Sequence, residues 1–252
     1  MAEKKDRFYE ARLTKRTDLT EDLAQFYFHV EGDVTFEPGQ YATLALENTE
    51  KKLVQRPYSI VSSPLEPTLE FLVELVPHGE FTPLLWNVHV GDTILVRKKI
   101  VGKFVLDQKK THHLMVATVT GVAPYVSILR TQKIRLEKEK ENPHRFLVLQ
   151  GASYPKELEG YQEELTQLSQ ETDWFTYIPT ISRPWEATEW KGETGRVDDL
   201  VRKYSDSLGF THKNSVAYVC GHPDMIEHVK GMLSRARFDK EQLKEEKYFQ
   251  IR

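Results

Sequence analysis

The chain has 252 residues, of which 39% are hydrophobic and 29% are charged, and its net charge is −3. This composition is typical of a globular protein with one large domain or two of ordinary size. The negative net charge argues against a nucleic-acid-binding protein, because neutralising phosphates requires an excess of basic groups. The single cysteine, Cys220, excludes a disulfide framework and a four-thiolate iron–sulfur cluster.

Two further classes are disfavoured by the sequence. No apolar run approaches the length that spans a membrane, and the first residues lack the apolar core of a signal peptide. The histidines show no metal-ligand spacing with partner carboxylates. We therefore expect a cytoplasmic protein with no metal site and no membrane or nucleic-acid partner.

The first part of the chain, residues 8–97, is alternating and rich in turn residues. Glycine and proline turns separate short apolar runs, a pattern typical of an antiparallel barrel or sandwich. One short helix is expected over residues 83–86. The expected strands are 8–14, 24–30, 40–46, 53–60, 69–76 and 93–96.

After about residue 110 strands alternate with helices, which predicts a parallel sheet with helices on both faces. We expect two domains, an antiparallel β-barrel over residues 1–107 and an α/β doubly wound parallel sheet over 108–237, followed by a charged tail over 238–252. The expected strands are 113–118, 145–152, 175–182 and 215–220, and the expected helices are 122–138, 161–169, 197–204 and 223–235.

A cation, a ring and a hydroxyl follow one another in Arg56, Pro57, Tyr58 and Ser59. Side chains alternate along a strand, so Arg56 and Tyr58 share one face. That pair suits a ligand that is anionic at one end and flat at the other, such as a flavin dinucleotide. Pro57 cannot donate to a ladder, so the strand lies at an edge or ends there. The alternative is a surface arginine beside a half-buried tyrosine.

A second candidate site is the turn that contains Gly79, Phe81 and Thr82. A glycine before a short helix leaves backbone N–H groups that, with Thr82, could hold a pyrophosphate. The alternative is a simple turn in which Thr82 caps the helix.

Two more turns lie where predicted parallel strands end, over residues 117–124 and 218–225. Ligands of such sheets bind outside the carboxyl ends of the strands, so both turns could face one crevice. Cys220 lies in the second turn, and an inert buried thiol is its alternative reading. Arg183 and Arg196 follow the third parallel strand and could clamp an adenosine 2′-phosphate, unless both are ordinary surface arginines.

Taken together, these motifs resemble the ferredoxin–NADP⁺ reductase family, especially its compact bacterial members. The family's R-x-Y-S motif matches residues 56–59 and its phosphate turn matches 79–82. Its A-T-G-T-G-x-x-P and C-G-x-P-x-M motifs match residues 117–124 and 220–225. The tail over 246–249 resembles the acidic-x-aromatic ending of these enzymes.

The resemblance implies FAD on the first domain, NADP(H) on the second, and a tail that returns to the flavin. It implies hydride transfer between NADP(H) and flavin N5, and single-electron exchange with ferredoxin or flavodoxin. The implied FAD-binding residues are Arg56, Pro57, Tyr58, Ser59, Gly79, Phe81, Thr82 and Phe249. The implied NADP(H)-binding residues are Thr120, Gly121, Pro124, Arg183 and Arg196, and the implied catalytic residues are Ser59, Cys220, Glu246 and Tyr248.

Two residues depart from the family pattern. Val119 stands where the family has glycine, and Ser153 stands where many bacterial members carry another arginine. A Cβ at Val119 crowds the approach of a dinucleotide, and Ser153 removes one phosphate contact. The alternatives are a flavin, quinone or ferric reductase, and an electron-transfer subunit of a larger complex. We expect a monomer.

Overall fold

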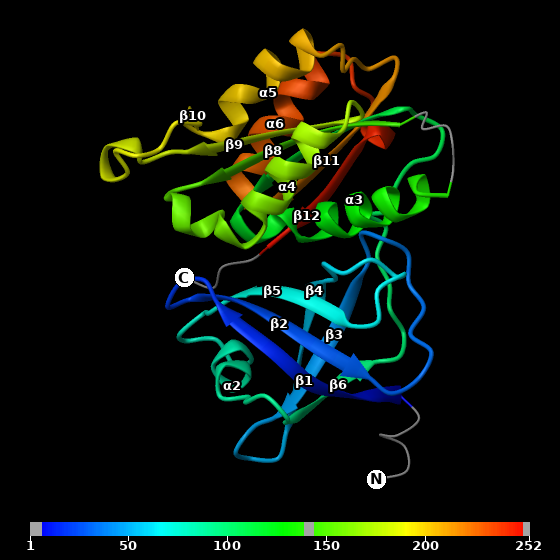
Figure 1. Cartoon of the computed structure of the whole chain (residues 1–252), viewed down its shortest axis with the longest axis vertical. Helices are drawn as coiled ribbons and strands as arrows, with labels where there is room; N and C mark the ends of the chain where they lie inside the picture. The colour runs from blue at the N-terminus through cyan, green and yellow to red at the C-terminus, as the bar shows by residue number, and fades with distance from the viewer. Residues whose placement is uncertain (1–6, 139–143, 249–252) are drawn as a thin grey trace. The chain divides into compact units, whose positions relative to one another are not determined.

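The computed structural model describes residues 7–138 and 144–248 (Figure 1). The chain divides into two compact units. The first comprises the residues up to 105 together with 126–135, and the second comprises 106–125 and 136–248. The expected end of the first domain was residue 107. Among the described residues, no helix is long and apolar enough to cross a membrane.

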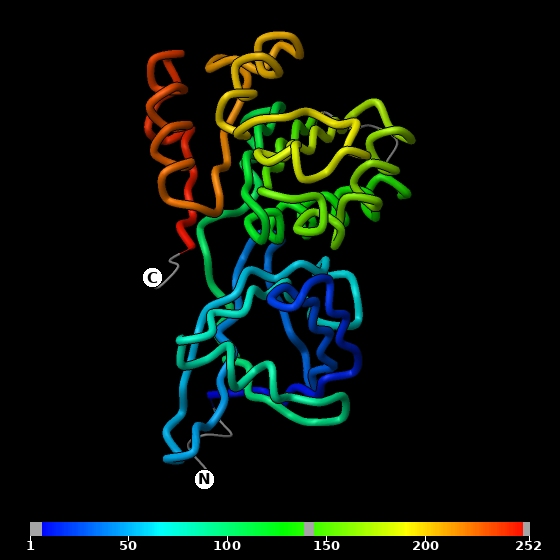
Figure 2. Tube along the Cα trace, turned by 90° about the vertical axis from the view of Figure 1, so that its left-hand side faces the viewer, coloured from blue at the N-terminus to red at the C-terminus, as the bar shows by residue number. Residues whose placement is uncertain are grey.

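The first unit is built on one six-stranded antiparallel sheet in the order β4-β3-β6-β1-β2-β5. The outermost strands of this order meet where the Val61 N–H donates to the Glu70 carbonyl at 2.9 Å, so the sheet curls into a barrel, as Figure 2 shows. The predicted antiparallel barrel is therefore confirmed. Its elements are β1 (Phe8–Asp18), β2 (Leu23–Val30), β3 (Tyr41–Glu47), β4 (Leu53–Ser59), β5 (Leu69–Glu74), α2 (Thr82–Trp86) and β6 (Thr93–Arg97).

Alternating apolar residues explain the barrel. In β1 Ala11 and Leu13 are buried, and in β2 Phe26 and Phe28 are buried, so each strand turns one apolar face inward. Phe28 lies 6.1 Å from Phe71 of β5, ring to ring. Burying each such side chain stabilises the fold by about 1.5–3 kcal/mol.

The second unit is built on a six-stranded parallel sheet in the order β10-β9-β8-β7-β11-β12. Its strands are β7 (His112–Thr118), β8 (Arg145–Ala152), β9 (Phe175–Ile181), β10 (Glu193–Thr194), β11 (Ser215–Gly221) and β12 (Leu243–Lys247). Its α-helices are α4 (Glu159–Glu171), α5 (Val197–Ser207) and α6 (Pro223–Arg235), and the two ends of α3 (Ala123–Leu136) also belong to it, whereas residues 126–135 of α3 belong to the first unit. The predicted parallel α/β fold is confirmed.

The central strands of this sheet are apolar along their length because both faces are covered. In β8, Leu147 and Leu149 belong to the core that also contains residues of α5 and α6. Alternation places Val148 and Gln150 on the opposite face. A second, smaller core contains Ala152 and Ile181 together with Leu158, which immediately precedes α4.

Two strands were not expected from the sequence. β10 is only two residues long. β12 lies in the segment that we expected to be a charged tail, and it extends the sheet by pairing in parallel with β11, with Glu246 opposite Cys220. Its charged side chains are paired with α6, because Lys230 lies 2.5 Å from Glu245 and Lys247 lies 2.6 Å from Glu227. These tertiary contacts substitute for the apolar pattern that normally marks a strand.

Candidate functional site

In the barrel unit, β4 carries the Arg56–Ser59 motif at the edge of the sheet order, as Pro57 predicted. The Arg56 Nη2 lies 3.1 Å from the Glu80 carboxylate, and its Nη1 donates to the Gln55 carbonyl at 2.8 Å. The fold thus brings Arg56 to the turn over residues 79–82, which is the other candidate phosphate site in this unit. Exposed ion pairs stabilise a protein by only about 0–1 kcal/mol, so Arg56 can exchange Glu80 for a phosphate at little cost.

Tyr58 lies beside the same turn, with its ring 5.6 Å from the Phe81 ring. Burial raises the pKa of Tyr58, so the phenol keeps its proton at neutral pH. The Phe81 side chain and Ser59 are buried. An arginine and a half-buried ring therefore lie at the turn over residues 79–82, and this arrangement fits the anionic and flat parts of FAD.

Thr82 has a structural role that the sequence did not reveal. Its hydroxyl accepts from the Val76 N–H at 2.9 Å and donates to the Val76 carbonyl at 3.1 Å. The residue at the N-cap of α2 is Phe81, without a side-chain cap, so the alternative that Thr82 caps this helix is wrong. Because the Thr82 hydroxyl already serves Val76, the turn offers a pyrophosphate chiefly its backbone.

In the parallel unit, the turns after β7 and β11 pack backbone against backbone. A Cβ on Gly121 would lie 2.3 Å from the Cys220 carbonyl oxygen, and a Cβ on Gly221 would lie 2.2 Å from Thr118 Oγ1. The Thr118 hydroxyl also accepts from the His222 N–H at 2.9 Å. Only glycine permits this approach, and it brings Thr120, Gly121 and Cys220 to one place at the carboxyl ends of two neighbouring strands. Pro124 lies in the first turn of the helix that follows.

Val119 begins the 3₁₀ turn η1 (Val119–Val122) with φ = 42°. This left-handed conformation is unfavourable for a side chain branched at Cβ, by about 1–2 kcal/mol. The departure from the family pattern therefore leaves a glycine-like backbone in place, with a valine side chain on it.

Cys220, Glu246 and Tyr248 gather at the carboxyl end of β11. Burial and the nearby Glu246 carboxylate raise the pKa of the Cys220 thiol, against a hydrogen bond from Tyr248 that lowers it. The Tyr248 N–H donates to the Gly221 carbonyl at 3.1 Å, so the residue after β12 continues along β11. Cys220 is thus a neutral thiol that is poorly suited to act as a nucleophile. Phe249 lies outside the described residues.

Arg183 and Arg196 lie on neighbouring stretches of chain. Thr194 pairs with Ile181 in register, so each arginine stands two residues beyond a paired residue. The Arg183 guanidinium stacks 5.1 Å above the Tyr154 ring and hydrogen-bonds its hydroxyl. The Arg183 N–H donates to the Ser153 carbonyl at 3.2 Å, so the residue in place of the family's third arginine lies beside Arg183.

Arg196 is held by a residue that the sequence analysis missed. Its Nε lies 3.1 Å from Oδ1 of Asp198, whose other oxygen lies 2.8 Å from Nδ1 of His228. Burial tends to raise the pKa of Asp198, but hydrogen bonds from His228 and Arg196 outweigh it and the pKa is lowered. The spacing Arg-x-Asp after a turn was the available signal, but His228 is thirty residues farther along the chain.

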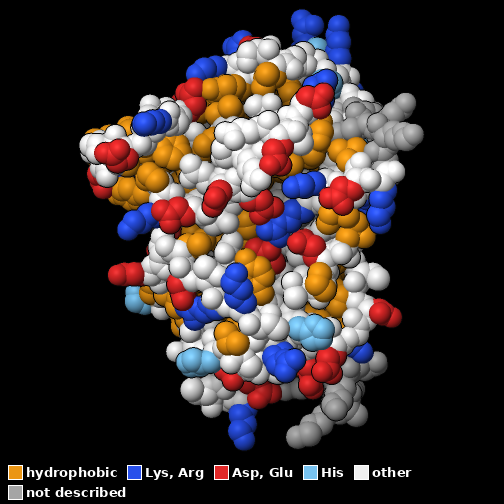
Figure 3. All heavy atoms as spheres, in the orientation of Figure 1, with side chains coloured by type: hydrophobic (Ala, Val, Ile, Leu, Met, Phe, Trp, Pro, Cys, Tyr) orange, Lys and Arg blue, Asp and Glu red, His pale blue; other side chains and the backbone are white. Residues whose placement is uncertain are grey.

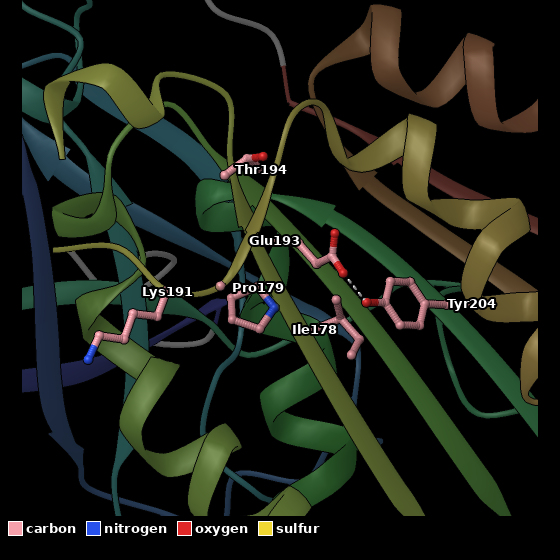
Figure 4. A pocket seen from close by; sticks show the side chains of 7 residues that line it. Ile178, Pro179, Lys191, Glu193, Thr194 and Tyr204 are labelled. Atoms are coloured by element: carbon pink, nitrogen blue, oxygen red, sulfur yellow. Dashed lines mark hydrogen bonds between the residues drawn. The ribbon is translucent and has the colours of Figure 1, made fainter. Parts of the chain in front are cut away.

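A pocket of about 400 Å³ is lined by residues that are close in sequence to Arg183 and Arg196, but neither arginine lines it (Figure 4). It is lined by Ile178, Pro179, Tyr204 and residues 191–194. Its carboxylate, Glu193, accepts from Tyr204 and from Lys203, the latter at 2.6 Å. No predicted site residue lines it. Within residues 7–138 and 144–248, no group of three or more His, Cys, Asp or Glu side chains is placed to hold a metal ion.

Comparisons with known proteins identify the family of each part of the chain. The oxidoreductase FAD-binding domain family matches residues 10–105, and the oxidoreductase NAD-binding domain family matches residues 115–231. The flavodoxin/ferredoxin–NADP reductase of Buchnera aphidicola subsp. Baizongia pistaciae is 30% identical over 206 residues, which cover 79% of each chain. The protein of the same description from Escherichia coli (strain K12) is 30% identical over 222 residues, 85% of each chain.

The fold is also similar to a solved structure. The structure of a ferredoxin NADP⁺ reductase from Neisseria gonorrhoeae with bound FAD and NADP superposes with a TM-score of 0.81 at 25% identity. The match covers 96% of this chain and 99% of that one. The similarity therefore includes the fold of the barrel unit and the fold of the parallel unit.

Proposed function

This chain belongs to the ferredoxin–NADP reductase family, and from this premise we propose which residues perform its reaction and which partner it serves. It is an FAD-dependent oxidoreductase that uses NADP(H). The observation that carries the residue assignments is the packing of Gly121 against Cys220. This packing brings the residues proposed for the nicotinamide side together at the carboxyl ends of β7 and β11. The bound flavin supplies the conversion between two-electron hydride chemistry and one-electron exchange.

In the barrel unit, Arg56 would bind the FAD pyrophosphate, together with the backbone of residues 79–82. Tyr58, which stays protonated, would lie against one face of the flavin ring, and buried Ser59 would lie near N5. These residues bind and orient, and none of them needs to change its charge. The support is the proximity of Arg56 to Glu80 and of Tyr58 to Phe81.

In the parallel unit, Thr120, Gly121 and Pro124 would line the nicotinamide nucleotide site. The neutral Cys220 thiol and the Glu246 carboxylate would border the position of hydride transfer, where they exclude water and limit how the nicotinamide can lie. Tyr248 would cover the flavin on the side that the nicotinamide approaches. The support is the pairing of Glu246 with Cys220 and the contact of Tyr248 with the same thiol.

Arg183 and Arg196 would hold the 2′-phosphate of NADP(H). Both follow paired strand residues at the carboxyl edge of the sheet, and both guanidinium groups are supported by neighbouring side chains. Two supported arginines compensate for Ser153, which offers no charge.

The electron carrier would be a small redox protein such as ferredoxin or flavodoxin. Basic residues that could attract an acidic carrier are divided within the barrel unit. Lys51 and Lys52 lie beyond the end of β3. Lys98 and Lys99 follow β6, which runs antiparallel to β3, so they lie toward the start of β3. On the face shown in Figure 3, basic and acidic side chains are interspersed. The domain limits, the monomeric state and the cytoplasmic location stay predictions.

One experiment tests the proposal as a whole. The purified protein is saturated with FAD, and reduction of a dye, a ferredoxin and a flavodoxin is followed with NADPH and with NADH. We expect faster reduction with NADPH and transfer to at least one of the two carriers. Dye reduction without transfer to either carrier would point to a flavin, quinone or ferric reductase. A protein that cannot be loaded with FAD would contradict the proposal.

A further inference from the structure

The turn that carries the proposed nicotinamide site has an unusual residue at its start. Val119 adopts φ = 42°, a conformation that glycine reaches freely and that valine rarely adopts. A strained backbone of this kind persists only where the surrounding structure holds it. The side chain of Val119 packs against the small core of Ala152, Leu158 and Ile181. That contact fixes the side chain, but the orientation of the peptide group needs a separate partner.

A buried amide provides that partner. Gln150, in β8, donates from Nε2 to the Val119 carbonyl at 3.2 Å. Tyr177, in β9, donates its hydroxyl proton to Gln150 Oε1 at 2.7 Å. Gln150 is 1% exposed and Tyr177 is 6% exposed, so water does not compete for these groups. Tyr177 in β9 and Gln150 in β8 thus form a chain of hydrogen bonds that ends at Val119, the residue after β7.

Tyr177 holds the amide in the orientation that the Val119 carbonyl requires. A glutamine amide presents a donor on one side and an acceptor on the other. The Val119 carbonyl can only accept, so it faces the nitrogen side of Gln150, and the Tyr177 hydroxyl donates to the oxygen side. The nitrogen side of Gln150 is then directed at the Val119 carbonyl.

Holding the carbonyl also sets the next N–H group. The Val119–Thr120 peptide is planar, and in a trans peptide the N–H points opposite to the C=O. With the carbonyl of Val119 bound to Gln150, the N–H of Thr120 points away from Gln150. Thr120 and Gly121 are the residues proposed to line the nucleotide site, so this orientation determines what the turn presents there.

We propose that Gln150, oriented by Tyr177, is a positioning residue that holds the nucleotide turn in its left-handed conformation at Val119. Gln150 and Tyr177 thus stabilise the positive φ at Val119, a conformation that a glycine would adopt without such support. This inference rests on the proposed function, because it assigns the turn to NADP(H).

The test compares four variants of the FAD-loaded protein. Gln150→Met removes both hydrogen bonds and Tyr177→Phe removes only the one to Gln150 Oε1, each with little change in volume. Val119→Gly removes the strain, and the double variant combines it with Gln150→Met. The matched control is Gln242→Met, because Gln242 is also buried and donates to backbone carbonyls, those of His212 and Ser215, at the other end of the sheet.

The readouts are NADP⁺ affinity by calorimetry, KM and kcat for NADPH with a dye, and the melting temperature. We expect Gln150→Met to weaken NADP⁺ binding and raise KM by about fivefold to tenfold, with kcat within about twofold. Tyr177→Phe should have a smaller effect in the same direction. Gln242→Met should lower the melting temperature comparably and leave NADP⁺ binding unchanged.

The Val119→Gly background tests the mechanism. Glycine adopts positive φ without penalty, so Gln150→Met should cost less affinity there than in the wild type. An equal loss in both backgrounds would show that Gln150 does not act through Val119. Unchanged affinity in Gln150→Met, or an equal loss in Gln242→Met, would also overturn the inference. A wild type that binds neither NADP⁺ nor NAD⁺ would instead contradict the proposed function.

Discussion

Two arginines proposed to hold phosphate groups are supported in opposite ways. Arg56 in the barrel unit is 43% exposed, and its carboxylate partner, Glu80, is 75% exposed. Arg196 in the parallel unit is 56% exposed, but its partner Asp198 is only 2% exposed and is also bound by His228. An exposed ion pair can separate at little cost in free energy, whereas a buried carboxylate that loses its partners destabilises the fold.

If both arginines bind phosphate as proposed, the difference predicts how each would meet its ligand. Arg56 is free to turn from Glu80 to a phosphate, so its binding strength comes from the new contact. Arg196 is anchored through its Nε before any ligand arrives, so less conformational freedom is lost when a phosphate binds. The following changes test this contrast, from the largest expected effect to the smallest.

The largest effect should come from removing the buried carboxylate. Asp198→Ala should lower the free energy of unfolding by about 2–3 kcal/mol, because the hydrogen bonds from Arg196 and His228 to this buried carboxylate are lost. Glu80→Ala should change it by less than about 0.5 kcal/mol. Urea unfolding of both variants at pH 7 measures the difference, and equal losses would contradict the contrast.

The pH dependence of this effect follows from the direction of the shift. The pKa of Asp198 is lowered in the folded protein, so its contribution is complete above the unfolded value of about 3.9. It is lost as the pH falls through the lower, folded value. The gap between wild type and Asp198→Ala should therefore be constant from pH 5 to 8, within about 0.5 kcal/mol, and close only in stronger acid.

A smaller loss is expected at Arg56, and it should appear in cofactor affinity. Arg56→Ala should bind FAD about tenfold to a hundredfold more weakly, the value of a charge-assisted contact. Glu80→Gln should bind FAD at least as tightly as wild type, because it frees Arg56. Flavin absorbance after gel filtration and titration of the apoprotein measure both. A stoichiometric, tightly bound flavin in Arg56→Ala would rule out this role.

Replacing Arg183 tests whether an arginine held by stacking on Tyr154 binds the 2′-phosphate, as proposed for Arg196, which is held by Asp198. Arg183→Ala should raise KM for NADPH about tenfold and leave KM for NADH nearly unchanged, because NADH lacks the 2′-phosphate. Arg145→Ala is the control, since Arg145 is an arginine in the same unit that bonds the Asp173 carbonyl. Equal losses with both nucleotides would make Arg183 structural.

The smallest effect is expected from Tyr248, which leaves both phosphate-binding arginines intact. Tyr248→Ser should tighten NADP⁺ binding by about threefold to tenfold if the ring occupies the place of the nicotinamide. Tyr248→Phe keeps the ring but loses the hydrogen bond to Cys220, so it should bind NADP⁺ as the wild type does. Titrations followed by the flavin spectrum compare the three proteins, and identical affinities would show that the ring does not compete.

Much of the fold could be predicted because its signals are local. The bounds predicted for β8 and α6 agree with the structure, since an apolar run defines the first and Pro223 starts the second. Pro57 correctly indicated an edge strand. β12 could not be recognised, because Leu243 is its only apolar residue and its stability depends on pairing with β11 and on ion pairs with α6.

The candidate site divides along the same line. The turns over residues 79–82, 117–124 and 218–225 could be predicted, because their glycines and prolines depend on local backbone geometry. Asp198 with His228 and Gln150 with Tyr177 were missed, because each pair joins residues 27 or more positions apart. The binding role of Thr82 stays a prediction, but its hydrogen bonds to the Val76 backbone could not be predicted, because the sequence does not show which group a hydroxyl contacts.

The charged strand β12 also bears on how the protein behaves when it is concentrated. It is the last strand on its side of the described sheet, and the open edge of a sheet is a template on which strands of other molecules can add. Four consecutive charged residues, 244–247, make that addition unfavourable, because an incoming strand would have to strip water from them. The same residues that hide β12 from sequence patterns therefore protect the sheet from aggregation.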